Sequence, residues 1–296
     1  MLVRIFKYFM VVISGLLVVW WLNIPFLDSP KDNAPTIVTS TPILADLTQQ
    51  LMGPDVKIVS LTDRVSDPAS QTISEQKIDL LKKADLVLLN GDPIDQKINV
   101  ATQVNRDAQV LNVGELMGKY EKNWSQYYWM NPVKWNRLVH YLQIQFKRVF
   151  PNRRSEINYR KMAYTNDIYV LHKGLKEGMD ELKKSTKVLC SNHESLAVFA
   201  KAFGFEFVPI TLSKDMDEAA LNDVVDALKK NNVKIIYPND AIPQDGIDDL
   251  VKAAVSQGWQ LQVGPPVFSL NLDVDGSGVD SYMDMMTFNL RAITDS

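Results

Sequence analysis

Few side chains of this sequence are suited to metal binding or nucleophilic chemistry: it has three histidines and one cysteine. The single thiol, Cys190, excludes an intramolecular disulfide and any thiolate-rich zinc or iron–sulfur site. His193 follows a predicted strand and opens a predicted helix, where ligand-binding side chains of α/β folds cluster, so it is a candidate ligand. The alternative is that its ring satisfies the polar groups of that turn. His172 shares the apolar face of its predicted helix and should pack there, whereas His140 lies beside such a face and should meet solvent.

A second candidate site is the acidic stretch from Asp273 to Asp284, whose spacing is that of a twelve-residue calcium loop. Asp273, Asp275, Ser277 and Asp284 supply oxygen atoms at positions 1, 3, 5 and 12, and a glycine stands at position 6. Serine at position 5 and aspartate at position 12 weaken the match, and a strand precedes the loop instead of a helix. The alternative is an acidic loop that leads into a helix capped by its own polar residues.

The sequence contains no recognisable catalytic motif. No glycine-rich phosphate loop follows a predicted strand, and nothing around Cys190 resembles a catalytic cysteine signature. No spacing argument assembles Glu194, Asp240 and Asp245 into an acid–base pair. We therefore predict that the chain is not an enzyme.

An aromatic cluster lies at Trp124, Tyr127, Tyr128 and Trp129. Such side chains can bind an organic solute by stacking and hydrogen bonding, or they can pack against the body of the fold. The sequence leaves both uses open.

The composition bounds the class of protein. Of 296 residues, 46% are apolar and 23% are charged, which excludes a largely disordered chain. The net charge of −3 makes nucleic acid an unsuitable partner, because phosphate binding needs a cationic surface.

The first 33 residues read as a membrane segment with a linker. Arg4 and Lys7 precede an apolar run from Tyr8 to Leu27, which is about the 20 residues needed to cross a bilayer. We predict an uncleaved anchor, with a cleaved signal peptide as the alternative. Both place the remainder outside the membrane, in the periplasm or at the cell surface. No cysteine follows the run, so a lipoprotein anchor is excluded.

Beyond the linker, short apolar runs alternate with helical patterns, which predicts βαβ units and mainly parallel sheets. Residues 152–185 lack proline and place apolar side chains at helical spacing, so they predict a helix about 50 Å long. The predicted fold is α/β: two lobes, each with a mainly parallel sheet flanked by helices, bridged by one long helix. The predicted boundaries are 34–151 for the first lobe, 152–185 for the helix and 186–296 for the second lobe. Strands are expected at 36–40, 56–61, 84–89, 110–113, 187–190, 205–210, 233–237 and 260–263.

Four stretches in this order resemble the solute-binding proteins of zinc and manganese ABC importers, known as cluster A-I. They are Thr39–Leu47, Ser66–Pro68 with Lys83–Gly91, Trp129–Pro132, and Asp280–Leu290. The resemblance covers nearly the whole chain beyond the linker. It implies two lobes around a rigid helix, with one metal ion bound between them.

The departures from this family concern the four metal ligands that the resemblance implies. Ala69 stands where a histidine follows Asp-Pro, and Tyr127 stands where a histidine precedes the tryptophan by two residues. His193 matches the third position, and Leu270 stands at the carboxylate position. A tight zinc or manganese site needs a full set of donor atoms, so one imidazole predicts a degenerate site.

The resemblance therefore implies a periplasmic solute-binding protein of a zinc- or manganese-type ABC transporter with a degenerate metal site. The implied partners are an ABC permease in the membrane and a small solute or metal ion. The implied ligand is a divalent metal, zinc or manganese, with calcium as a minor alternative. The competing hypothesis is an adhesin-like or scaffold protein that kept the fold and lost the metal.

Overall fold

The computed structural model describes residues 34–98, 108–121, 124, 126–182 and 187–296. The predicted N-terminal membrane segment lies outside these residues. Within them, no helix combines the length and apolar character needed to cross a bilayer. Residues 35–296 form one compact unit.

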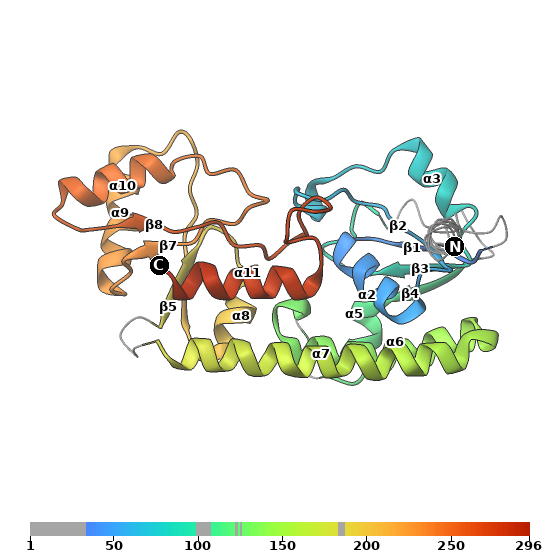
Figure 1. Ribbon diagram of the computed structural model, residues 1–296. Coiled ribbons are helices and arrows are strands. Elements are labelled where there is room, and N and C mark those ends of the chain that lie inside the picture. The colour runs from blue at the N-terminus through green and yellow to red at the C-terminus, as the bar shows by residue number, and fades with distance from the viewer. Residues whose placement is uncertain (1–33, 99–107, 122–123, 125, 183–186) are drawn as a thin grey trace, which may run out of the picture. The chain divides into compact units, whose positions relative to one another are not determined.

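The first lobe is built on a four-stranded parallel sheet in the order β2-β1-β3-β4 (Figure 1). Each strand lies within one or two residues of its prediction, because each is a short apolar run between a turn and a helix. The strands are β1 (Thr36–Thr39), β2 (Lys57–Ser60), β3 (Leu86–Leu89) and β4 (Gln109–Asn112). The helices are α2 (Pro42–Met52), α3 (Glu75–Leu81), α5 (Val113–Gly118) and α6 (Pro132–Val149), with 3₁₀ turns η1 (Pro68–Ser70) and η2 (Tyr128–Met130).

The second lobe repeats this arrangement, with a parallel sheet in the order β6-β5-β7-β8. Its strands are β5 (Val188–Ser191), β6 (Glu206–Pro209), β7 (Ile235–Ile236) and β8 (Gln262–Val263). Its helices are α8 (Ser195–Phe203), α9 (Glu218–Lys230) and α10 (Ile247–Ser256), and α11 (Tyr282–Thr294) ends the chain. The prediction of two α/β lobes with parallel sheets is confirmed.

Helix α7 (Arg154–Asp180) joins the lobes, and it packs against α6, α2 and α11. The predicted range of 152–185 was too long. Residues Pro151–Arg153 form a separate 3₁₀ turn, η3, because a proline imposes a new start, and the last predicted residues lie outside the described part. The inward face of α7 carries the regularly spaced apolar residues Ile157, Tyr164, Ile168, Leu175 and Met179.

Local capping explains where several helices begin. Ser74 accepts a hydrogen bond from the amide of Lys77 at the start of α3, and Thr41 and Asn131 cap α2 and α6 in the same way. The sequence did not predict α5. The side chain of Asn112, at the end of a predicted strand, accepts from the amide of Glu115 and turns the chain into that helix.

The largest apolar core runs through both lobes without a break. It includes Leu44 of α2, Trp135 of α6, Phe199 of α8 and Met285 of α11. Apolar burial of this kind stabilises the contact between the lobes as well as each lobe. The lobes are therefore joined by packed side chains in addition to the helix.

Candidate functional site

The carboxyl ends of the two sheets converge on a small cavity of about 50 Å³. In open parallel sheets this is where ligands bind, at the point where the strand order reverses. The cavity is lined by the four residues that stand where the family resemblance implied metal ligands: Ala69, Tyr127, His193 and Leu270. The remaining lining residues are Asp67, Pro68, Pro93, Ile94 and Trp129.

Ala69 lies in the 3₁₀ turn η1, and its backbone amide donates to the carboxylate of Asp67 at 3.0 Å. Asp67 therefore works as the cap of this turn, although it also lines the cavity. The methyl group of Ala69 adds no donor atom. This wall of the cavity offers one carboxylate that already has a structural partner.

Tyr127 packs its ring edge-to-face against Trp129 at 5.8 Å and against His193 at 5.4 Å between ring centroids. Its hydroxyl lies 3.4 Å from Oε1 of Glu194, which also accepts from Gln126 at 2.8 Å. Burial, followed by the nearby Glu194 carboxylate, raises the pKa of Tyr127 well above its usual value. The hydroxyl therefore stays protonated at neutral pH and is a poor metal ligand.

Leu270 is a core residue in this structure. It is only 3% exposed and belongs to the same apolar cluster as Tyr127 and Trp129. The indole N–H of Trp129 donates to the backbone carbonyl of the preceding Ser269 at 2.9 Å, which fixes this segment against the first lobe. Leu270 therefore contributes apolar packing at the position where the resemblance implied a carboxylate.

His193 uses one ring nitrogen to begin helix α8. The amide of Ser195 donates to Nδ1 at 3.2 Å, and the Ser195 hydroxyl contacts the same nitrogen at 2.8 Å. The hydrogen-bond chain continues from Ser195 to Ser269, whose hydroxyl accepts from Asn239 at 2.6 Å. Because a backbone amide can only donate, Nδ1 is an acceptor and the proton of the neutral ring lies on Nε2.

A histidine that binds a metal through Nε2 carries its proton on Nδ1 and donates it to an oxygen, which is the opposite of the tautomer found here. Burial lowers the pKa of His193, while Asp67 and Glu194 oppose that shift, so the neutral ring is favoured. Coordination through Nε2 would require Nδ1–H to face the amide of Ser195. The ring does satisfy the polar groups of its turn, and its role as a metal ligand stays a prediction.

The aromatic cluster is largely buried in packing. Trp124 stacks on Tyr128 with centroids 4.4 Å apart, and the Tyr128 hydroxyl donates to Asn90 at 2.7 Å. Tyr128 and Trp129 are almost fully buried. With a cavity of about 50 Å³ beside them, these rings leave no room for an organic solute to stack.

The stretch from Asp273 to Asp284 binds an arginine. Arg64 donates to the carbonyl oxygens of Asp273 at 2.8 Å and Asp280 at 3.0 Å, and it pairs with the Asp275 carboxylate at 3.0 Å. The Asp284 carboxylate bonds with the Ser281 hydroxyl in the first turn of α11. Ser277 accepts from the amide of Val279. These contacts give the loop oxygens other partners and favour the alternative, an acidic loop that leads into a capped helix.

The other candidate residues are apart from the cavity. His172 lies beside Phe203, and His140 is exposed beside Tyr141, as expected. Burial raises the pKa of Cys190 to about 12, which keeps the thiol protonated and unreactive. Among the residues that the structure describes, no three His, Cys, Asp or Glu side chains lie close enough to hold a metal ion.

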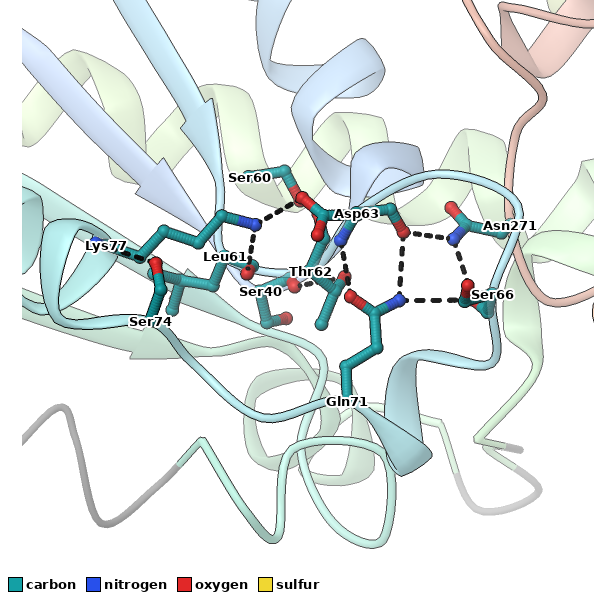
Figure 2. A network of polar contacts seen from close by, with 10 residues as sticks. All are labelled: Ser40, Ser60, Leu61, Thr62, Asp63, Ser66, Gln71, Ser74, Lys77 and Asn271. Atoms are coloured by element: carbon teal, nitrogen blue, oxygen red, sulfur yellow. Dashed lines mark hydrogen bonds and ion pairs between the residues drawn. The ribbon is translucent and has the colours of Figure 1, made fainter.

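The sequence did not predict a contact between the lobes that lies one residue beyond Leu270: the amide group of Asn271 bridges them. It donates to the carbonyl oxygens of Asp63 at 2.7 Å and Ser66 at 2.9 Å (Figure 2). Gln71 braces the same loop by accepting from the amide of Asp63 and donating back to its carbonyl. We call the contacts of Asn271 and Arg64 with the opposite lobe the interlobe latch. In the sequence, the one feature that pointed to this latch was the position of Asn271 next to Leu270.

Comparisons with known proteins identify the family. The ZnuA family model, described as zinc-uptake complex component A periplasmic, matches residues 37–296. The zinc-binding protein TroA of Treponema pallidum is 22% identical over 90% of each chain. The manganese-binding lipoprotein MntA of Bacillus subtilis is 23% identical over 89% of this chain and 90% of its own.

Solved structures show the same fold. The periplasmic zinc-binding protein TroA from Treponema pallidum superposes with a TM-score of 0.81 at 20% identity, over 89% of this chain and 99% of its own. The manganese-bound periplasmic metal-binding protein from Candidatus Liberibacter asiaticus gives 0.75 at 15% identity, over 88% and 98%. With the family model matching nearly the whole described chain, the protein belongs to the ZnuA family of periplasmic zinc-uptake components.

Proposed function

We propose that this protein is the solute-binding component of an ABC importer of the metal-uptake type, and that its cavity has lost tight binding of zinc and manganese. Family membership supports the first part, and relatives carry names such as manganese ABC transporter substrate-binding lipoprotein. The lining of the cavity carries the second part. Of the four positions that correspond to ligands, one holds an imidazole, one a protonated phenol and two hold hydrocarbon.

The relatives are named for binding and transport, and we propose a non-enzymatic role for this chain as well. Its location would be the outer side of the membrane, tethered by the N-terminal segment, with a permease in the same membrane as partner. The cargo would be a single small ion held weakly, because a cavity of about 50 Å³ has room for little more.

Calorimetric titration of the metal-free, full-length protein with zinc chloride and manganese chloride tests this proposal. We expect no saturable binding at micromolar protein, because a lone imidazole cannot replace a four-donor site. Stoichiometric tight binding that is abolished by His193→Ala would contradict the proposed loss of the site.

A gain-of-function variant checks the placement of the cavity. Combining Ala69→His, Tyr127→His and Leu270→Asp should create a zinc site with one ion per chain, since three converging ligands and a water suffice for zinc. The matched control carries Leu270→Asn alone, which leaves His193 as the one imidazole of the cavity. Equal binding by the two variants would mean that these positions do not act together.

A second candidate function, a non-transport scaffold or adhesin-like protein, is favoured by the interlobe latch. Contacts made by Asn271 and Arg64 hold the lobes together with protein atoms alone, so no ligand is needed to complete that contact. The gene neighbourhood separates the two functions. Adjacent genes for a permease and an ATPase would support transport, and their absence would support the scaffold.

A further inference from the structure

Helix α7 carries a second apolar stripe on the face turned away from the core. Tyr159, Met162, Tyr169 and Val170 are between 60% and 76% exposed. At 100° per residue they point opposite to the buried residues that anchor the helix, such as Tyr164 and Ile168. In Figure 1, α7 lies along one edge, with the labelled elements on its inner side. Exposed apolar side chains that gather on one face mark an interaction site more often than scattered ones do.

Two polar residues on the same face of α7 continue the regular spacing of this stripe. Asn166 lies at its centre, between Met162 and Tyr169, and Lys173 continues it towards the end of the helix. The spacing of Tyr159, Met162, Asn166, Tyr169 and Lys173 alternates between three and four residues, as on the contact face of paired helices. The stripe is about 21 Å long at 1.5 Å per residue.

We propose that α7 pairs with α7 of a second copy of this chain, antiparallel, about a two-fold axis beside Asn166. A two-fold contact uses the same patch on both copies, so each residue must find its partner within the stripe. Centred on Asn166, the symmetry sets Met162 against Val170 of the second copy. It sets Asn166 against its own counterpart, where two carboxamides can exchange hydrogen bonds. The polar centre of the stripe is thereby satisfied.

Charge complementarity selects the antiparallel arrangement. It places Lys173 of one copy over the ring of Tyr159 of the other, a favourable cation–π contact. It also brings Glu177 close to the opposite helix start, where Arg154 and the positive end of the helix dipole lie. A parallel pair would instead stack Lys173 on Lys173 and Glu177 on Glu177. Because each copy contributes few apolar side chains, the pair should be a weak, reversible dimer.

Disulfide trapping of the full-length protein in detergent tests the two-fold axis. Asn166→Cys should form an intermolecular disulfide under mild oxidation at least about tenfold faster than Ser155→Cys, because the axis raises the local concentration of its partner thiol. Ser155 is the matched control: it is exposed on the same face, but the antiparallel axis separates it from its counterpart by about 33 Å. The native Cys190 is buried and will not contribute.

Sedimentation velocity supplies a second readout that needs no new thiol. Met162→Lys should shift the full-length protein towards monomer, whereas Val255→Lys, at an equally exposed valine on α10, should not. Equal trapping rates for Asn166→Cys and Ser155→Cys would overturn the antiparallel axis. A monomer at every concentration, or equal effects of the two lysine variants, would overturn the pairing itself.

Discussion

At the scale of single residues, His193 lines the cavity and already uses one ring nitrogen in a hydrogen bond of the fold. His193 is the one histidine at a position implied by the family resemblance. Its Nδ1 accepts from the amide of Ser195, so the ring serves as the opening contact of α8. What decides the role of a histidine is the partner of its second nitrogen, and that partner is fixed by the fold.

The four positions chosen by counting along the sequence line one cavity, and short motifs anchor two of them: Asp67-Pro68 for Ala69, and Trp129 for Tyr127. The chemistry at those positions was less predictable. The tautomer of His193 depends on a hydrogen-bond chain through Ser195, Ser269 and Asn239, which come from three separate segments. No local pattern encodes such a chain.

Asp95 provides a residue-scale prediction about pH. It is fully buried, its Oδ1 finds no hydrogen-bond partner among the described residues, and burial raises its pKa to about 6. The folded protein therefore binds a proton that the unfolded chain releases between about pH 4 and 6, and stability falls as the pH rises through that window. Asp95→Asn should add about 2 to 3 kcal/mol to the free energy of unfolding at pH 7 and almost nothing at pH 4.

Urea unfolding of the full-length protein at both pH values measures this difference. Asp226→Asn, which removes an exposed carboxylate on α9, is the control and should have little effect at either pH. If Asp95→Asn destabilised the protein equally at pH 4 and pH 7, the effect would be independent of ionisation and would contradict the raised pKa of Asp95.

At the scale of elements, the positions of the strands were predictable because each is a short apolar run that ends at a turn. The predicted strands 233–237 and 260–263 were too long, since β7 and β8 have two residues each. Helix α5 was missed because the stretch Val110–Val113 fits both a strand end and a helix start. The side chain of Asn112 decides between them by capping the helix. The latch was missed for another reason: loop 61–71 and the segment 269–273 are some 200 residues apart in sequence and meet only in the fold.

The latch holds its loop in an unusual conformation. Val65 has a φ of 61°, a left-handed value that costs a β-branched residue free energy. Its amide donates to the carbonyl of Leu272 at 3.3 Å, and its neighbours Arg64 and Ser66 are both bound by the opposite lobe. We infer that these contacts together maintain the conformation of the loop.

Asn271→Ala is the test at this scale. Asn271 is fully buried and donates two hydrogen bonds across the lobes, so its removal should cost about 1 to 3 kcal/mol of stability. The amide of Val65 should also exchange with solvent faster. Asn271→Asp should be worse at pH 7 than at pH 4, because an ionised carboxylate would face two carbonyl oxygens.

Urea unfolding and hydrogen exchange of these variants provide the measurements. Asn158→Ala, at an exposed position on α7, is the control and should change neither. Unchanged exchange at Val65 in Asn271→Ala would mean that the loop keeps its conformation without the latch.

At the scale of the whole molecule, the two lobes share one apolar core in addition to the latch. Leu270 and Trp129 belong to this core at the wall of the cavity, and Tyr282 of α11 donates to the carbonyl of Trp129 at 2.9 Å. A ligand shifts the balance between open and closed lobes only by its difference in affinity for the two states. Here protein atoms already hold the lobes together through the contacts of Asn271 and Arg64.

Zinc and manganese ions should therefore leave the balance between open and closed lobes unchanged. Hydrogen exchange of the full-length protein, followed over loop 61–71 and the segment 269–273, should be the same in zinc chloride, manganese chloride and a chelator. The ions have no complete donor set through which to favour the closed state. The variant Ala69→His, Tyr127→His, Leu270→Asp is the positive control, because zinc bound to it would protect both segments. Protection of the unmodified protein by zinc would show that the cavity still couples metal binding to closure, and the relatives' metal chemistry would then extend to this chain.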